Sequence, residues 1–206
     1  MRVAVVGGTG PFGRALATRL REAGYDVVIG SRDAARAGAL AEKIGVEGAT
    51  NADAARTADL IVLATKADAA LETARGLKEQ IGSTPVLSVA SELHFAPSGV
   101  LPTAEGTSLA ERLQAELDAP VAAGLHSLAA STLGKDRPPD EDALVCGDDP
   151  DGKALALELA ERITAGRAYD AGPLASARAL EGLTAVIVNL NKRYKGHAGI
   201  SIAGLP

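Results

Sequence analysis

The sequence predicts an α/β protein with a doubly wound parallel sheet and a small C-terminal α/β appendage. Short apolar runs alternate with amphipathic stretches along most of the 206 residues, which is the pattern of strand–helix–strand units. A glycine-rich turn joins the first apolar run to the first amphipathic stretch. Aromatic residues make up only 2% of the chain, so the core has to be built from alanine, valine, leucine and isoleucine.

The expected elements follow from these periodicities. Strands are predicted at residues 3–6, 26–29, 60–64, 86–89, 121–125 and 143–146, with a weaker one at 167–170. Helices are predicted at residues 12–23, 34–44, 67–80, 109–117, 153–164 and 176–191. Two stretches without periodicity, 91–107 and 134–142, follow strand ends, where open α/β sheets bind ligands. We expect a dinucleotide-binding domain at residues 1–125 and a smaller substrate-binding part at residues 126–206.

Composition argues against several function classes. The formal net charge is −5, without a basic block, and the chain has two Phe and no Trp, so nucleic acid is not an expected partner. No apolar run reaches the ~18 residues that span a bilayer, so a membrane is not an expected partner either. Cys146 is the only cysteine, which excludes an intramolecular disulfide and a cysteine metal cluster. A cytoplasmic protein without a metal site is expected.

The glycine-rich turn matches the dinucleotide fingerprint G-x-G-x-x-G of the Rossmann fold. It reads Gly8-Thr9-Gly10-Pro11-Phe12-Gly13. The motif alone is weak, but here it follows a predicted strand and opens a predicted helix, as the fold requires. Its glycines let the backbone approach a pyrophosphate, and the helix N-terminus offers free N–H groups to the anion. Pro11 fits the first helical position, although it removes one donor.

The end of the second predicted strand indicates NADP rather than NAD. NAD sites usually place an acidic residue there for the ribose hydroxyls, whereas this chain has Ser31 and Arg32, with Arg36 one helical turn further on. A guanidinium forms charge-assisted hydrogen bonds with a phosphate dianion, and the Ser31 hydroxyl adds a donor. Asp33 follows, either as a helix cap or as a carboxylate that weakens the phosphate preference.

Beyond these motifs, the sequence resembles the F420H2:NADP oxidoreductases, which exchange a hydride between NADP(H) and the deazaflavin coenzyme F420. The likeness covers nearly the whole chain. Its N-terminal segments are Met1 to Gly10, Ile29-Gly30-Ser31-Arg32 and Arg36. Its C-terminal segments are Leu125-His126-Ser127, Val145-Cys146-Gly147-Asp148-Asp149, Asp170-Ala171-Gly172-Pro173-Leu174, Ser176-Ala177-Arg178, Glu181 and Leu183-Thr184.

The resemblance implies roles for individual residues. It puts NADP phosphate contacts at Thr9, Ser31, Arg32 and Arg36, and deazaflavin contacts at His126, Leu128, Ala130, Arg178 and Thr184. The fingerprint residues and Lys66 complete the expected cofactor site. His126 is the candidate to hydrogen-bond a ring carbonyl, with a charge state tuned near neutral pH. The structural alternatives are a backbone-bonded histidine, a solvated Arg178 and a Thr184 that bonds within its own helix.

Four departures from the family pattern lie on the side of the second substrate. They are Thr65-Lys66-Ala67-Asp68, the run from Ala90 to Phe95, Ala129 in place of a proline, and Gly182 in place of a serine. Two other functions therefore stay open: an NADPH-dependent reductase of an imine or enone metabolite, with Lys66, Glu92 and His94 as acid–base groups, and an NADP-binding redox sensor without catalysis. The apolar last helix favours a homodimer.

Overall fold

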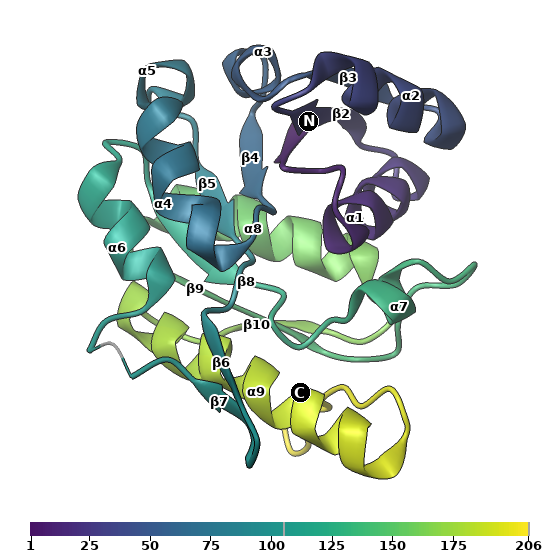
Figure 1. Cartoon of the computed structure of the whole chain (residues 1–206), viewed down its shortest axis with the longest axis vertical. Helices are drawn as coiled ribbons and strands as arrows, with labels where there is room; N and C mark the ends of the chain where they lie inside the picture. Colours follow the sequence, from purple (N-terminus) through teal and green to yellow (C-terminus); the bar gives the residue numbers. More distant parts are fainter. Residues whose placement is uncertain (105, 206) are drawn as a thin grey trace.

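The computed structural model describes residues 1–104 and 106–205, and it contains the expected doubly wound sheet (Figure 1). Eight strands form one sheet in the order β10-β9-β8-β5-β4-β1-β2-β3. Their bounds are β1 (Arg2–Val6), β2 (Asp26–Ser31), β3 (Glu47–Thr50), β4 (Leu60–Leu63), β5 (Val86–Ser88), β8 (Val121–Gly124), β9 (Ala143–Gly147) and β10 (Ala168–Asp170). Neighbouring strands run parallel except β8 and β9. The predicted fold class is confirmed.

Helices cover both faces of this sheet. They are α1 (Pro11–Glu22), α2 (Ala34–Ile44), α3 (Asn51–Arg56), α4 (Ala67–Gly76), α5 (Lys78–Ile81), α6 (Leu109–Glu116), α7 (Ala130–Leu133), α8 (Pro150–Ile163) and α9 (Ala177–Tyr194), with a short 3₁₀ turn η1 (Leu174–Ser176) before α9. Val3 and Val5 of β1 pack with α1, α2 and α8, whereas Ala4 and Val6 pack with α3, α4, α6 and the start of α9. The side chains of a strand alternate between faces, so one short apolar run contributes to both cores.

Within residues 1–81, three elements differ from the sequence prediction. The helix expected over residues 67–80 is interrupted at Leu77, directly after Gly76, so that α4 and α5 are separate. A glycine weakens a helix interior, which makes this a favourable place for a break. The pair β3 and α3 was not predicted, because β3 reads Glu47-Gly48-Ala49-Thr50 and lacks the large apolar residues that mark a strand.

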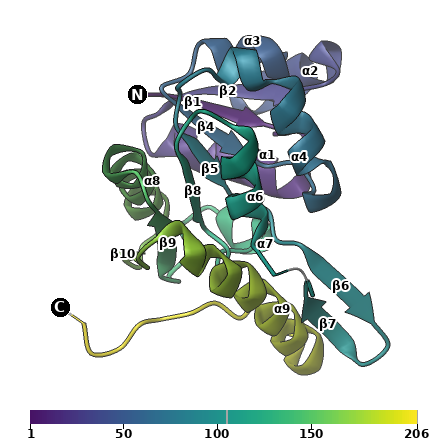
Figure 2. The same cartoon turned by 90° about the vertical axis from the view of Figure 1, so that its left-hand side faces the viewer.

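The stretch 91–107, expected to lack regular structure, contains an antiparallel hairpin. Its strands are β6 (Leu93–Ala96) and β7 (Gly99–Pro102), and Gly99 adopts φ +135° at the turn. Figure 2 shows the hairpin reaching away from the sheet beside the C-terminal half of α9. The Asn189 side chain of α9 accepts a hydrogen bond from Val100 N (2.8 Å) and donates one to Val100 O (2.7 Å). The hairpin was missed because its stability depends on this helix, distant in sequence.

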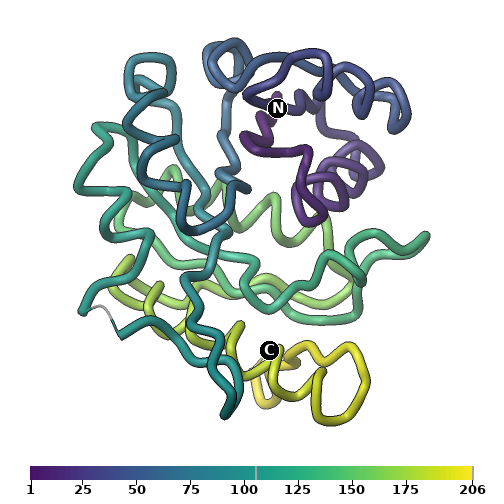
Figure 3. Tube along the Cα trace, viewed as in Figure 1, coloured from purple at the N-terminus to yellow at the C-terminus, as the bar shows by residue number. Residues whose placement is uncertain are grey.

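The strands on both sides of the proposed domain boundary at residue 125 belong to the same sheet. Figure 3 traces the chain through this boundary. The C-terminal tail packs on the segment before β9, where Asp142 N donates to Ile200 O (2.9 Å) and Ile202 N donates to the Asp142 carboxylate (2.6 Å). Arg167 N also donates to this carboxylate (2.8 Å), and the amides of Ile202 and Arg167 lower the pKa of Asp142. None of the described helices combines the length and the apolar character needed to cross a membrane.

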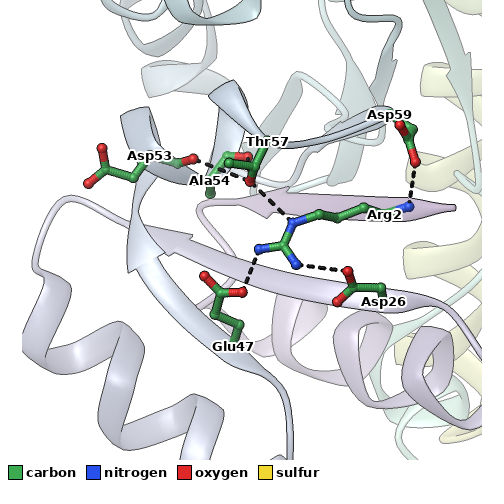
Figure 4. A network of polar contacts seen from close by, with 7 residues as sticks. All are labelled: Arg2, Asp26, Glu47, Asp53, Ala54, Thr57 and Asp59. Atoms are coloured by element: carbon green, nitrogen blue, oxygen red, sulfur yellow. Dashed lines mark hydrogen bonds and ion pairs between the residues drawn. The ribbon is translucent and has the colours of Figure 1, made fainter.

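A polar network closes the amino-terminal edge of the sheet (Figure 4). The Arg2 guanidinium of β1 pairs with Asp26 of β2 and Glu47 of β3, and its Nε donates to Thr57 (3.2 Å). The Arg2 backbone N–H donates to Asp59, just before β4 (2.7 Å). This network lies at the end of β1 opposite the glycine-rich turn, so it holds strands together and leaves the carboxyl-terminal edge to the candidate site.

Candidate functional site

The candidate site begins at the glycine-rich turn between β1 and α1. Gly7 adopts φ +75°, and Gly8 N donates to Val5 O and Gly30 O, both at 3.1 Å. A Cβ on Gly13 would lie 2.6 Å from Gly8 Cα, whereas a Cβ on Gly10 would meet only Gly7 O at 3.8 Å. Gly13 therefore allows close packing of helix on strand, and Gly10 faces open space.

The N-terminus of α1 is left available for an anion. Gly10 is its N-cap, no side chain caps it, and Pro11 occupies the first turn. The first-turn amides of a helix have no partner within the helix, and here they belong to Phe12 and Gly13. Backbone donors and a favourable helix dipole at one point suit a pyrophosphate.

A cleft of about 460 Å³ runs from this helix end to the end of β2. It is lined by Gly7, Thr9, Gly10, Pro11, Phe12, Ser31, Arg32, Asp33, Arg36, Asn51, Ala64, Thr65, Lys66, Ala69 and Thr73. The structure thus brings together most of the predicted cofactor residues, while Gly8 and Gly13 pack beneath the turn. In the described part of the chain, neither Arg32 nor Arg36 has a side-chain hydrogen bond or ion pair. Two unpartnered guanidiniums in one cleft make a site for a phosphate dianion.

Asp33 acts as a helix cap. Its carboxylate accepts a hydrogen bond from Arg36 N (3.2 Å), and its own N–H donates to the Ser31 hydroxyl (3.2 Å). Of the two roles that the sequence left open, the structure supports the cap. The carboxylate is tied to the start of α2, which holds Arg36 in place.

Two residues of this cleft were missed in the sequence. Asn51 accepts a hydrogen bond from Gly7 N (3.2 Å) and so supports the glycine-rich turn from α3. Its role depends on β3 and α3, which left no clear periodic signal. Thr65 packs its methyl group against Gly7, and its hydroxyl is buried without a hydrogen-bond partner among the described residues. Such a hydroxyl is suited to a ligand group, because an unpaired buried donor costs about 1–3 kcal/mol.

A second cleft of about 530 Å³ adjoins the first and is mainly apolar. Its lining residues are Phe12, Ala64, Thr65, Lys66, Ala67, Asp68, Val89, Ala90, Ser91, Glu92, Leu93, Phe95, Leu125, His126, Leu128 and Thr184. Four of them also line the first cleft, namely Phe12, Ala64, Thr65 and Lys66. The two clefts therefore share a wall at the carboxyl ends of β1 and β4.

His126 lies in this cleft and is 6% exposed. Neither ring nitrogen has a hydrogen bond of good geometry to the described residues. Burial lowers the pKa of His126 to about 4, and an interaction with the Ala90 backbone only partly offsets this. The sequence suggested an imidazole that titrates near neutral pH. The buried ring is instead neutral at pH 7, where it can donate one hydrogen bond and accept another.

A backbone conformation and the contacts of one side chain fix the segment around His126. Leu125 adopts a left-handed conformation, φ 65°, which is rare for a branched residue and ends β8 abruptly. The Thr184 hydroxyl of α9 donates to His126 O (3.1 Å) and lies 2.7 Å from the Ser91 hydroxyl. Thr184 therefore does not bond within its own helix. It joins α9, the β5–β6 connection and the His126 segment at one point.

Two of the expected deazaflavin residues lie outside this cleft. Ala130 is the first residue of α7 and is not among the lining residues. Arg178 lines a separate cavity of about 690 Å³ between α9 and the hairpin, and its guanidinium donates to Gly106 O (3.2 Å). Glu92 lines both this cavity and the second cleft, so the two adjoin each other. Its carboxylate forms an ion pair with Arg112 (2.6 Å). Arg178 and His126 thus do not face one cleft.

Cys146 and His94 add no chemistry at this site. Burial raises the pKa of Cys146 in β9 to about 12, so the thiol stays protonated. His94 is exposed on β6 and does not line the second cleft. Among the described residues, no group of three or more His, Cys, Asp or Glu side chains is placed to hold a metal ion.

Comparison with known proteins identifies the family. The model of the family described as "NADP oxidoreductase coenzyme F420-dependent" matches residues 2–92. An F420-dependent NADP reductase of Methanothermobacter thermautotrophicus is 37% identical, with 100% of this chain and 96% of the relative covered. An F420-dependent NADP reductase of Methanocaldococcus jannaschii is 34% identical, with 100% of this chain and 99% of the relative covered. The chain belongs to the F420-dependent NADP reductase family.

Structural similarity extends over the whole chain. A candidate F420-dependent NADP-reductase from Arthrobacter sp. FB24, solved by crystallography, superposes with a TM-score of 0.85 at 28% identity, covering 99% of this chain and 100% of that one. The resemblance inferred from the sequence motifs is confirmed, and so is the assignment as an oxidoreductase of this family. The F420-dependent NADP reductase assignment takes the place of the metabolite-reductase and sensor alternatives.

Proposed function

We propose that the chain transfers a hydride between NADP(H) and coenzyme F420, with NADP in the first cleft and the deazaflavin ring in the second. The observation that carries this proposal is the wall that the two clefts share, formed by Phe12, Ala64, Thr65 and Lys66. Two ligands that occupy adjoining clefts meet at that wall. Direct transfer between two rings requires such close approach and exclusion of water.

The first cleft fits NADP along its length. The first-turn amides of α1 and the open face of Gly10 suit the pyrophosphate, while Arg32, Arg36 and the Ser31 hydroxyl suit the 2′-phosphate. The nicotinamide ring then lies toward Thr65 and Phe12, where the buried Thr65 hydroxyl needs a partner.

The second cleft fits a planar, largely apolar ring with a few polar groups at its edge. His126 is neutral, and its ring nitrogens form no hydrogen bond of good geometry with the described residues, so it is the residue that would donate a hydrogen bond to a ring carbonyl. Lys66 lines both clefts and so could place its ammonium group near either ring. When both coenzymes are bound, NADPH would supply a hydride to the oxidised deazaflavin ring and leave as NADP+, and a proton from water would complete the reduced ring. The residues of the chain bind, orient and desolvate, and none forms a covalent bond.

A spectroscopic assay tests the proposal. NADPH and oxidised F420 are mixed with the protein, and the absorbance of each coenzyme is followed. We expect both absorbances to fall together, at a rate proportional to the protein concentration. A protein that binds NADPH but exchanges no hydride with F420 at any pH would show that the proposed reaction is wrong.

The cofactor preference has its own test. Arg32→Ala should weaken NADPH binding by about 1.5–3 kcal/mol, roughly one to two decades in affinity, because a charge-assisted hydrogen bond is lost. NADH lacks the 2′-phosphate, so its affinity should change little. Arg14→Ala is the matched control, since Arg14 is exposed on α1 and does not line the cleft. Equal losses for NADPH and NADH would contradict the assignment of Arg32.

We propose that the chain works as a homodimer in the cytoplasm. NADP(H) is a coenzyme of the cell interior, which supports the location. Val186, Leu190 and Tyr194 are exposed large side chains on one helix, α9, and such a surface is typical of an interface. Sedimentation should give the mass of a dimer, and Val186→Glu should shift it toward the monomer. A wild-type protein that sediments as a monomer at micromolar concentration would contradict the proposed assembly.

A further inference from the structure

The two phenylalanines of the chain both line the second cleft. The sequence has two Phe and no Trp, and aromatic residues are rare throughout. Phe12 reaches the cleft from the start of α1, and Phe95 reaches it from the hairpin strand β6. In a chain with so few aromatic side chains, two in one cleft are a specific feature of that cleft.

Phe95 is an exposed aromatic side chain with a defined orientation. It is 68% exposed, although a phenyl ring in water is unfavourable. Leu93 and Phe95 line the cleft, whereas His94 between them does not, as expected for alternate residues of a strand. Lys192 Nζ of α9 lies 5.5 Å from the centroid of the Phe95 ring, in the range of a cation–π contact. The ring therefore contacts α9 through Lys192 and also lines the cleft.

The hairpin that carries Phe95 is fixed to the protein. Asn189 of α9 forms two hydrogen bonds with the Val100 backbone, as described above, and Thr103 N donates to Glu92 O (3.2 Å). The bonds from Asn189 join β7 to α9, and β6 is attached through its pairing with β7. The position of Phe95 relative to the cleft thus depends on packing between the hairpin and α9.

We propose that Phe95 covers the outer face of the deazaflavin ring and selects a planar aromatic coenzyme for the second cleft. This inference rests on the proposed function, because it names the residue that recognises the second substrate. An aromatic side chain stacks on a planar ring in offset geometry and loses its exposure to water at the same time. The Ala90–Phe95 segment, one of the departures from the family pattern, then supplies this contact itself.

Kinetics of Phe95→Ala test the proposal. We expect the KM for F420 to rise about tenfold, the size of one lost aromatic stack, while the dissociation constant of NADPH stays unchanged. Phe95→Tyr should restore the wild-type KM, because the ring is retained. Leu101→Ala is the control, since Leu101 is exposed on the same hairpin, opposite His94, and lies outside the cleft. An unchanged KM in Phe95→Ala would overturn the proposal.

A binding measurement separates this proposal from the proposed reaction. Phe95→Trp introduces the only tryptophan of the chain, so its fluorescence reports on this position alone. Titration with F420 should quench it to saturation, and NADP+ alone, which does not absorb the tryptophan emission, should not. Quenching without hydride exchange would overturn the reaction and leave the role of Phe95 standing. Fluorescence that does not respond to F420 would overturn the role of Phe95, whether or not the wild-type protein is active.

Discussion

At the scale of single residues, two glycines of one turn have opposite surroundings. A side chain on Gly13 would collide with Gly8, whereas a side chain on Gly10 has room in the folded protein. Gly10 also has φ −74°, a conformation open to any residue. The protein itself therefore needs a glycine at position 13, and only a bound pyrophosphate would need one at position 10.

We therefore expect Gly10→Val to fold and to lose NADPH. Its unfolding midpoint should stay close to that of the wild type, while NADPH affinity falls by at least about 100-fold, or 2.7 kcal/mol, because the branched side chain occupies the pyrophosphate position. Gly13→Val should instead unfold or melt well below the wild type. Calorimetry of NADPH binding and thermal melts measure the two effects. A folded Gly10→Val variant with wild-type NADPH affinity would mean that the motif is a structural turn and does not bind the pyrophosphate.

His126 should make the stability of the protein depend on pH. Its folded pKa is about 4, below the ordinary value of 6.5, so the unfolded chain takes up a proton first as the pH falls. The stability due to this group is complete above pH 6.5 and is lost between pH 6.5 and about 4. The full loss is about 3 kcal/mol, since one pKa unit corresponds to 1.36 kcal/mol.

Urea unfolding at several pH values measures this effect. His126→Gln should lose less stability between pH 7 and pH 4.5 than the wild type, and the exposed His94→Gln should behave like the wild type. Identical slopes for His126→Gln and the wild type would contradict the lowered pKa, because His126 would then take up a proton equally readily in the folded and the unfolded protein. In that case it could serve as a charged donor in the second cleft.

At the scale of elements, the contact between α9 and α6 holds the second cleft together. The Glu181 carboxylate of α9 is 3% exposed and accepts hydrogen bonds from Leu109 N and Ala110 N at the start of α6, both at 3.1 Å. Burial raises the pKa of Glu181, and the two amide donors oppose the shift. The same helix carries Thr184, which holds the His126 segment, so the docking of α9 also positions the cleft.

Glu181→Ala should therefore destabilise the protein by about 1–3 kcal/mol, because two buried amides lose their acceptor. Glu181→Gln keeps one acceptor oxygen and should cost less. Urea denaturation gives both values, with Glu42→Ala on the exposed side of α2 as the control. If Glu181→Ala were as stable as the control, the carboxylate would contribute nothing to the docking of α9.

The sequence predicts an element correctly where local interactions form it, and misses an element that depends on contacts with residues distant in sequence. The apolar runs of β1, β2 and β4 form the interior of the sheet, so local pattern alone predicts them. The hairpin at residues 93–102 and the pair β3 and α3 depend on contacts with distant elements, and pattern missed them. The phosphate-binding part of the first cleft was predictable because its residues belong to one fingerprint and one strand end, whereas Asn51 and Thr65 come from other elements and were missed. Arg178 was expected at the same coenzyme as His126, but it lines a separate cavity between α9 and the hairpin.

At the scale of the whole molecule, the parallel sheet brings the two clefts together. The glycine-rich turn follows β1, Thr65 and Lys66 follow β4, and His126 follows β8, all at carboxyl-terminal strand ends. Ligands of open α/β sheets bind at this edge. The hairpin and α9 then enclose the second cleft from outside the sheet. The central claim is that the shared wall allows a hydride to pass directly from one coenzyme to the other.

Transfer of deuterium tests that claim most directly. NADPH carrying deuterium on the transferred side of nicotinamide C4 is mixed with oxidised F420 and the protein in ordinary water, and reduced F420 is examined by mass spectrometry. Direct transfer between adjoining clefts predicts one deuterium in each reduced F420 formed. Reduced F420 that contains only protium from water would contradict the account, because the hydride would then not have crossed the shared wall.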